Sequence, residues 1–213
     1  MIPLFVDLSA KRVVIFGGGE VAARKAAYFT RDADVLAFSR SFSKRMIALP
    51  VSRTELDVVD ASDADLVDLL GGAFICIAAL SDNEQNNRIG KICQRMGILF
   101  NNADGERGDL IIPSVFCGKH YRIAVSTDGK SPAVARFIRE QLETRLSNLD
   151  KMIVLQGRLR QRLKSVEPSQ KRRRKILLEV LHDPVIWEAL SRSQSEADGI
   201  VNLRYLHDEV RSG

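Results

Sequence analysis

Cysteine is scarce in this sequence, and its three copies lie far apart. Cys76, Cys93 and Cys117 form no CxxC pair, and no histidine stands at a metal-ligand spacing from them. A disulfide framework or a structural zinc site needs clustered cysteines, so the sequence predicts neither. We interpret Cys76 and Cys93, which lie in apolar or helical patterns, as packing residues and assign no metal site.

Long hydrophobic runs are also missing. No stretch approaches the roughly 18 apolar residues that a membrane helix needs, and the N-terminal residues lack the features of a signal peptide. We therefore expect a cytoplasmic protein without a membrane partner. The 213 residues carry a formal net charge of +5. That charge suits a nucleic acid, an anionic membrane or a polyanionic small substrate, and composition alone does not choose among them.

Strand and helix patterns alternate over the first hundred residues. Apolar runs predict strands, and the stretches between them have helical periodicity; the runs are 3–8, 12–16, 34–39, 51–56, 73–80 and 98–101. This alternation is typical of α/β proteins with a doubly wound parallel sheet. Beyond residue 101 the pattern predicts two strands, at 111–117 and 121–127, then a helix from Ser131 and only helices from about 148. We expect three regions, 1–112, 113–147 and 148–213.

Three glycines lie between the run 12–16 and the helical pattern that follows it. Gly17, Gly19 and Ala22 satisfy G-x-G-x-x-G/A, which gives a tight turn, a close backbone approach to a pyrophosphate and close helix packing. A helix N-terminus placed there would bind the phosphates. The predicted cofactor-binding residues are Gly17, Gly18, Gly19, Glu20, Val21 and Ala22. A turn with a purely structural role remains the alternative.

The end of the second predicted strand lacks the acidic residue that usually binds the ribose of NAD. Ser39, Arg40 and Ser41 stand there instead. An arginine at this place suits the 2′-phosphate of NADP, although it could equally be a solvated surface cation. We include these three residues in the predicted cofactor site, together with Ala79 and Leu80 at the end of the run 73–80.

Four blocks of the sequence together resemble one known family. They are PLFVDLSAKRVVIFGGGEVAARKA, AALSDNEQNNRIGKICQRMGILFNNAD, LIIPSVFC and YRIAVSTDGKSPAVARFIREQLE, in that order over most of residues 2–146. They are similar to the precorrin-2 dehydrogenase and sirohydrochlorin ferrochelatase family, also known as the siroheme synthase N-terminal region. The resemblance implies a Rossmann domain, a small α+β dimerisation region, an α-helical C-terminal domain and a homodimer.

The resemblance also implies an activity. Members oxidise precorrin-2 to sirohydrochlorin in siroheme and tetrapyrrole biosynthesis and pass a hydride to NAD, or alternatively to NADP. Some also insert ferrous iron, which would be a substrate here, and the sequence leaves that activity open. A dinucleotide-sensing module without catalysis is the alternative function.

Asp104, which closes the stretch NNAD, is the predicted catalytic residue. It follows the last strand of the predicted sheet, where ligands of α/β proteins bind, and it matches the active-site aspartate of the family. A turn-capping aspartate before Gly105 is the other interpretation.

A cationic cleft is expected for a polycarboxylate tetrapyrrole. The candidate substrate-binding residues are Arg107, His120, Arg122, Thr127, Lys130, Ser131 and Arg136. The basic run 171–175 leads into an apolar helical pattern, so we interpret it as one polar helix face and expect no nucleic-acid partner.

Overall fold

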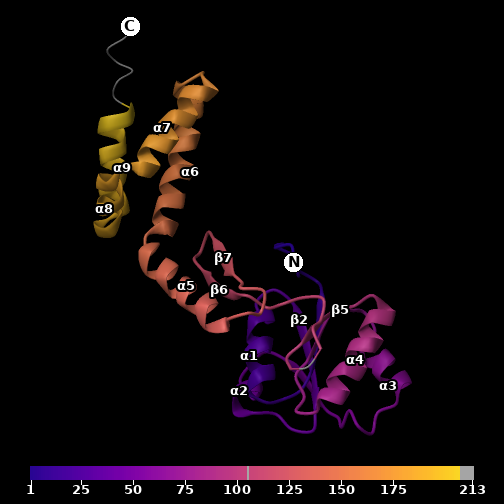
Figure 1. Cartoon of the computed structure of the whole chain (residues 1–213). Helices are drawn as coiled ribbons and strands as arrows, with labels where there is room; N and C mark the ends of the chain where they lie inside the picture. The colour runs from indigo at the N-terminus through magenta and orange to yellow at the C-terminus, as the bar shows by residue number, and fades with distance from the viewer. Residues whose placement is uncertain (105, 207–213) are drawn as a thin grey trace. The chain divides into compact units, whose positions relative to one another are not determined.

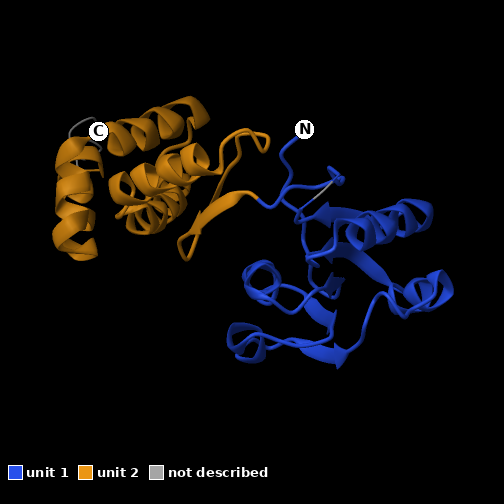
Figure 2. Ribbon diagram, turned by 60° about the horizontal axis from the view of Figure 1, so that its bottom comes forward, with its two compact units in different colours: residues 1–112 blue, residues 113–213 orange. Residues whose placement is uncertain are grey.

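The structure, a computed structural model, describes residues 1–104 and 106–206. The chain divides into two compact units, residues 1–112 and residues 113–213 (Figure 2). The predicted further division between residues 147 and 148 stays a prediction. No helix within the described residues is long and apolar enough to cross a membrane.

Unit 1 is built on a five-stranded parallel sheet with the order β3-β2-β1-β4-β5 (Figure 1). The chain starts in the middle of the sheet, winds out to one edge, and returns to β4 on the other side of β1. This confirms the predicted α/β, Rossmann-type doubly wound fold, and the order reverses between β1 and β4. The strands are β1 (Arg12–Phe16), β2 (Asp34–Ser39), β3 (Ser52–Glu55), β4 (Ala73–Ala78) and β5 (Leu99–Asn102).

Helices cover both faces of this sheet because β1 is apolar on both. Val13 and Ile15 pack on the side of α1 and α2, whereas Val14 and Phe16 pack on the side of α3 and α4. Successive side chains of a strand point to opposite faces, so a strand buried on both sides reads as one apolar run. The helices are α1 (Glu20–Phe29), α2 (Lys44–Ile47), α3 (Asp63–Leu69) and α4 (Asn83–Met96).

The cysteine interpretation is confirmed for the core of unit 1. Cys76 on β4 and Cys93 on α4 are free, fully buried and part of the same apolar cluster. Burial raises the pKa of the Cys76 thiol well above its ordinary value, so the thiol stays neutral. Both residues therefore act as small hydrophobic side chains.

The predicted strand at residues 3–8 was wrong. No strand precedes Arg12 in the structure. The side chains of Leu4, Phe5 and Val6 in this segment are exposed, as are those of Met1 and Ile2 before it. A short apolar run forms a strand only where a neighbouring strand offers free N–H and C=O groups. Among the described residues of unit 1, no strand pairs with this segment.

Unit 2 starts with an antiparallel hairpin, β6 (Ser114–Cys117) and β7 (Arg122–Val125), against which α5 (Pro132–Arg145) packs. Asp150, in the first turn of α6, accepts hydrogen bonds from the backbone N–H groups of Lys119 and His120, both at 2.8 Å. These bonds lower the pKa of the Asp150 carboxyl. They tie the β6–β7 turn to the helices that follow.

The rest of unit 2 is helical, as the sequence predicts. Met152, Leu155, Leu159 and Leu163 form one buried stripe along α6, and the other helices pack on it. The basic run 171–175 begins α7, where Arg172 pairs with Glu167 of the preceding turn. The helices are α6 (Leu149–Val166), α7 (Gln170–His182), α8 (Pro184–Arg192) and α9 (Gln194–Val201), followed by a π-helical turn (Asn202–Leu206).

Candidate active site

The carboxyl ends of four strands meet at one edge of the sheet in unit 1. Phe16 of β1 lies opposite both Phe38 of β2 and Ala78 of β4, and Ala78 lies opposite Asn102 of β5. The loops that follow these strands are therefore neighbours, although they lie far apart in the chain. All predicted cofactor residues and Asp104 belong to the ends of these strands, the loops that follow them or the first turn of α1.

The first two glycines of the cluster are required by packing within the protein. Gly17 has φ +129°, and a Cβ atom there would lie 2.5 Å from the carbonyl oxygen of Ala79. A Cβ on Gly18 would lie only 1.9 Å from the carbonyl oxygen of Ser41. The β1–α1 loop thus passes tightly between the loops after β4 and β2, and only glycine fits at both positions.

Gly19 has a different environment. Its φ is −76°, which any residue adopts, and a Cβ atom there would meet nothing within 4 Å. Packing inside the protein therefore gives no reason for a glycine at this position. A structural turn accounts for Gly17 and Gly18, whereas open space at Gly19 is what a closely approaching ligand needs.

The N-terminus of α1 is left open. Gly19 precedes the helix and offers no side chain to cap its first N–H groups, whereas Ser43, Ser62 and Asp82 cap α2, α3 and α4. Uncapped N–H groups and the positive end of the helix dipole make a site for an anion such as a pyrophosphate. Glu20 and Val21 in this first turn are exposed, and Ala22 is buried against the sheet.

Ser39, Arg40 and Ser41 lie beside the glycine loop, to which their own loop is hydrogen-bonded through Ser43 N–H and the Gly18 carbonyl at 2.8 Å. The Arg40 side chain is 73% exposed, and its Nη1 lies 3.6 Å from Oδ2 of Asp57. The sequence reasoning missed this acidic neighbour, which follows β3. An exposed pair of this kind contributes little to stability, so Arg40 stays available to an anionic ligand.

Asp104 follows β5 in an exposed bend. Within the part of the chain that the structure describes, its carboxylate has no hydrogen bond or ion pair. Its backbone carbonyl accepts a hydrogen bond from Nδ2 of Asn86, which also donates to the carbonyl of Leu80. The structure thus brings the predicted catalytic residue next to the loop after β4.

Lys25 and Asn101 form a contact between α1 and β5 that the sequence reasoning missed. Nζ of Lys25 donates to Oδ1 of Asn101 at 2.6 Å, and Nδ2 of Asn101 donates to the Leu110 carbonyl at 2.9 Å. Burial lowers the pKa of Lys25. The contacts join α1, β5 and the segment that returns to β5 at Leu110. A lysine in an amphipathic helix carries no sequence signal for such a contact.

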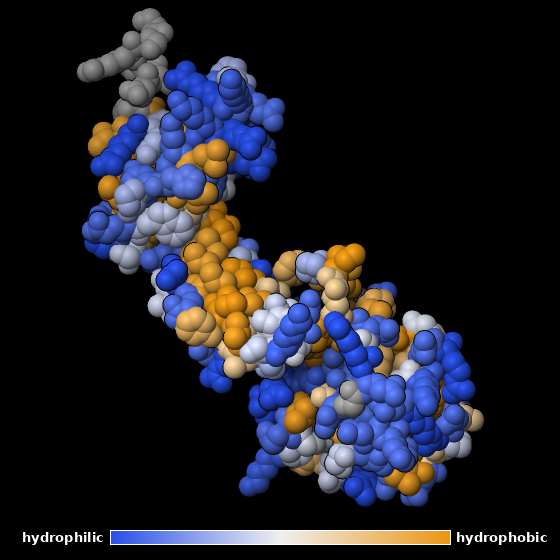
Figure 3. All heavy atoms as spheres, in the orientation of Figure 1, coloured by the Kyte–Doolittle hydropathy of each residue, from blue (hydrophilic) through white to orange (hydrophobic). Residues whose placement is uncertain are grey.

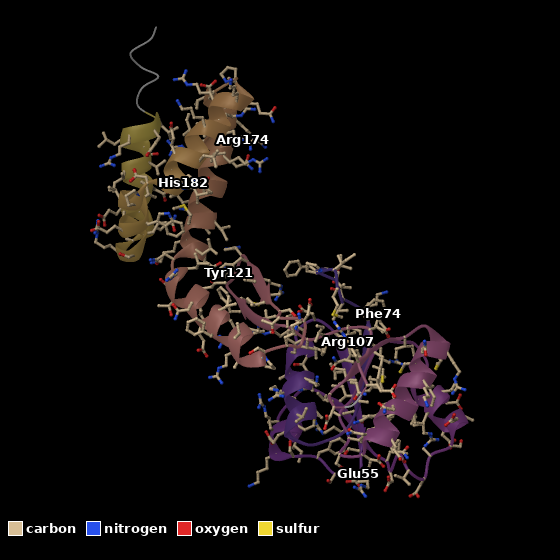
Figure 4. The ribbon with its side chains drawn as sticks, viewed as in Figure 1. Glu55, Phe74, Arg107, Tyr121, Arg174 and His182 are labelled. Carbon is tan, nitrogen blue, oxygen red and sulfur yellow. The ribbon has the colours of Figure 1, made fainter. Side chains whose placement is uncertain are left out.

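The candidate substrate residues fall into both units: Arg107 belongs to unit 1 and the other six to unit 2, where Tyr121 marks the hairpin (Figure 4). Thr127 Oγ1 donates to the Ser131 carbonyl at 2.9 Å and accepts from Ser131 N–H at 3.1 Å. The Ser131 hydroxyl caps α5 by accepting from Val134 N–H. These two hydroxyls therefore close the turn between β7 and α5.

The cations of this set differ in how they are held. Arg136 pairs with Glu140 at 2.8 Å, a contact that raises the pKa of Arg136. Arg122 points Nη1 at the Cys117 sulfur, 3.8 Å away, and His120 is bound to Asp150 through its backbone. Among the described residues, Arg107 and Lys130 have no ion-pair partner, which leaves both free for a carboxylate.

Two family models match the chain. One, described as putative NAD(P)-binding, covers residues 4–114, and the other, described as sirohaem biosynthesis protein central, covers residues 123–145. The first match spans more than half of the chain and contains every residue of the glycine cluster and the Asp104 bend.

Curated relatives agree with these models. A precorrin-2 dehydrogenase of Methanosarcina barkeri is 39% identical over 201 residues, which are 92% of this chain and 89% of that protein. A siroheme synthase of Photorhabdus laumondii is 33% identical over 175 residues, 81% of this chain but 37% of that protein. A solved structure, SirC, precorrin-2 dehydrogenase, has a TM-score of 0.69 at 23% identity and covers 95% of this chain and 100% of its own. That likeness establishes the fold.

Proposed function

The chain belongs to the precorrin-2 dehydrogenase family, and from this premise we propose that it oxidises precorrin-2 to sirohydrochlorin in siroheme synthesis, with NAD⁺ or NADP⁺ as the acceptor. The observation that carries the proposal is the open N-terminus of α1 behind Gly19, at the carboxyl edge where the strand order reverses. Beside it, the bend after β5 presents the Asp104 carboxylate.

The residues present fit a dinucleotide, because the space beside Gly19 is open. A side chain at this position would fill the space through which a pyrophosphate approaches the backbone. Gly18, Gly19 and the first turn of α1 would hold the pyrophosphate, and Ala79 and Leu80 would line the path toward Asp104. When bound, the nicotinamide accepts the hydride that leaves precorrin-2 with its electron pair. The reaction also releases one proton from the macrocycle, and we assign its removal to the Asp104 carboxylate.

Binding of the substrate is proposed to use cations. Precorrin-2 carries many carboxylates, and a charge-assisted hydrogen bond to a carboxylate is about twice as strong as a neutral one. The free side chains of Arg107 and Lys130 support a role for these two, with His120 and Arg122 as further candidates. Arg136 is already engaged by Glu140, so we rank it below them.

Anaerobic turnover of precorrin-2, generated in situ, tests the proposal with NAD⁺ and NADP⁺ in parallel. The expected result is the absorbance change to sirohydrochlorin with stoichiometric reduction of the nicotinamide. Tight dinucleotide binding without turnover, by protein shown to be folded, would favour a dinucleotide-sensing module instead. A parallel incubation of sirohydrochlorin with ferrous iron measures whether the chain also inserts the metal.

Arg40 is proposed to bind the 2′-phosphate of NADP⁺. Arg40→Ala should raise the KM for NADP⁺ by about 10- to 150-fold, since a hydrogen bond to a charged group contributes about 1.5–3 kcal/mol. The KM for NAD⁺ should change by less than about twofold, because no phosphate lies there. Arg31→Ala, which removes an exposed cation at the other end of α1, is the matched control. Equal effects of Arg40→Ala on both cofactors would contradict the assignment.

A homodimer is proposed to bury one face of α5. Val134, Phe137 and Ile138 are exposed at helical spacing, Phe137 to 61%, and Figure 3 shows hydrophobic side chains gathered over this helix. Residues three and four apart share a helix face, and an apolar face of this kind marks a contact site. The central sirohaem biosynthesis model covers all of α5.

Phe137→Asp should convert the dimer into a monomer, because a carboxylate would be buried without a partner at the centre of the interface. Size-exclusion chromatography with light scattering measures the change. Leu178→Asp, which puts the same charge on an exposed apolar residue of α7, should leave the mass unchanged. A monomeric wild-type protein, or a dimeric Phe137→Asp variant, would rule out this interface.

A further inference from the structure

Four of the chain's asparagines gather in unit 1 at the start of α4 and the end of β5. They form two adjacent pairs in the sequence, Asn86 with Asn87 and Asn101 with Asn102. Asn86 and Asn101 are two of the three buried polar residues among those described. Buried amides are retained where their hydrogen bonds hold a defined arrangement, because an unpaired buried polar group is costly.

Asp104 is held by this group at both of its backbone polar atoms. Its carbonyl accepts from Nδ2 of Asn86 at 3.4 Å, and its N–H donates to Oδ1 of Asn102 at 3.3 Å. Asn102 is fixed in turn, because its Nδ2 donates to Oδ1 of Asn87 at 3.0 Å. The same Asn87 oxygen accepts from the N–H of Glu106 at 3.3 Å. The bend around Asp104 is thus held from both sides.

Asn86 also connects this bend to the neighbouring loop. Its Oδ1 accepts from Leu80 N–H at 3.0 Å, and its Nδ2 donates to the Leu80 carbonyl, also at 3.0 Å. One fully buried side chain therefore bridges the loop after β4 and the bend after β5. The distance between the proposed nicotinamide path at Leu80 and the proposed base at Asp104 depends on this amide.

We propose that Asn86 and Asn102 are positioning residues for the Asp104 carboxylate. Within the described residues no side chain holds that carboxylate, so its place relative to Leu80 is set by the backbone that carries it. The two amides fix that backbone, and Asn86 also fixes it against the nucleotide-facing loop. This inference rests on the proposed function, in which Asp104 removes the proton.

Asn86→Ala tests the inference in steady-state kinetics. Its kcat should fall by about 30- to 100-fold, because displacing a reacting group by about 1 Å costs up to about 10²-fold. The KM for precorrin-2 should change by less than about threefold. Asn101→Ala is the matched control: Asn101 is equally buried, and its amide also donates to a carbonyl, that of Leu110. Its kcat should fall less than about threefold, at a comparable loss of urea stability.

Equal loss of kcat in the two variants, or an Asn86→Ala enzyme within threefold of wild type, would overturn the inference. Asn102→Ala covers the case in which Asn86→Ala fails to fold, because Asn102 is only partly buried. It removes the partner of the Asp104 N–H, and its kcat should fall about tenfold, by the same loss of position. An unchanged kcat in this variant would likewise contradict the proposal.

Hydrogen exchange separates this inference from the proposed function, since it needs no substrate. Peptides that contain Asp104 and Glu106 should exchange faster in Asn86→Ala and Asn102→Ala than in wild type, and those of α1 should not. If exchange is faster in both variants but the wild-type protein does not turn over precorrin-2, the two amides do hold residue 104, and only the proposed function is wrong. Unchanged exchange in both variants would refute the inference that Asn86 and Asn102 hold the backbone of Asp104.

Discussion

Asp104→Asn is expected to lower kcat for precorrin-2 oxidation by about 10²- to 10⁴-fold, the range that a positioned general base contributes. Asparagine has nearly the same shape and keeps the backbone contacts of residue 104 with Asn86 and Asn102. It cannot accept the proton. Because Asp104 is exposed and its side chain has no partner among the described residues, folding should be unaffected.

Rapid-quench or spectrophotometric turnover under anaerobic conditions measures this loss, and dinucleotide fluorescence titration checks that cofactor affinity is retained. Glu106→Gln neutralises an exposed carboxylate of the same bend and is the matched control, with kcat expected within about twofold because it holds no reacting group. If Asp104→Asn turned over at the wild-type rate, Asp104 would be a turn residue only, and another group would have to take the proton.

The second large effect is expected from alanine substitutions in the glycine cluster. Substitution of one glycine should weaken dinucleotide binding, whereas substitution of its neighbour should lower the stability of the fold. Gly19→Ala should weaken dinucleotide binding by about 10²-fold, because its methyl group would enter the space where the pyrophosphate approaches the backbone. Its urea midpoint should not change, since the new Cβ touches no protein atom within 4 Å. Gly18→Ala should instead lose about 1–3 kcal/mol of stability, as overpacking does, because its Cβ would overlap the Ser41 carbonyl.

Isothermal titration with NAD⁺ or NADP⁺, combined with urea unfolding, separates the two effects. The contrast is informative because the changes are chemically identical and one residue apart. Parallel losses of stability and affinity in both variants would mean that the cluster is a structural turn. Normal affinity in a stable Gly19→Ala protein would place the pyrophosphate elsewhere.

The sheet of unit 1 could be predicted because its central strands β1, β2 and β4 are apolar runs and the helices α2, α3 and α4 carry their own caps. Ser62 with Asp65, and Asp82 ahead of α4, are local signals that the sequence displays directly. The prediction of a strand at residues 3–8 was wrong because it relied on a local pattern alone. A strand exists only where another strand pairs with it, and that condition is not local.

The places of two candidate residues in the fold could be predicted in the same way, although their roles stay predictions. Gly17 and Asp104 follow apolar runs that predict β1 and β5, whereas the link between Asp57 and Arg40 needed the fold. The asparagine contacts were also hidden, because the partners of Asn86 are backbone atoms of residues 6 and 18 positions away. Whether an amide reaches them depends on how β4 and β5 are registered, which no periodicity encodes.

Hydrogen bonds within the protein hold the glycine loop in one conformation, and this lowers the entropic cost of binding a ligand there. Gly17 N–H donates to the Phe38 carbonyl and Ser43 N–H donates to the Gly18 carbonyl, each at 2.8 Å, so β2 and the loop after it hold the glycine loop before any ligand arrives. A loop already in its bound shape loses little conformational entropy when the pyrophosphate docks, so more of the contact energy remains as affinity. The glycines that make the loop flexible in the unfolded chain thus allow a packing that makes it rigid in the folded one.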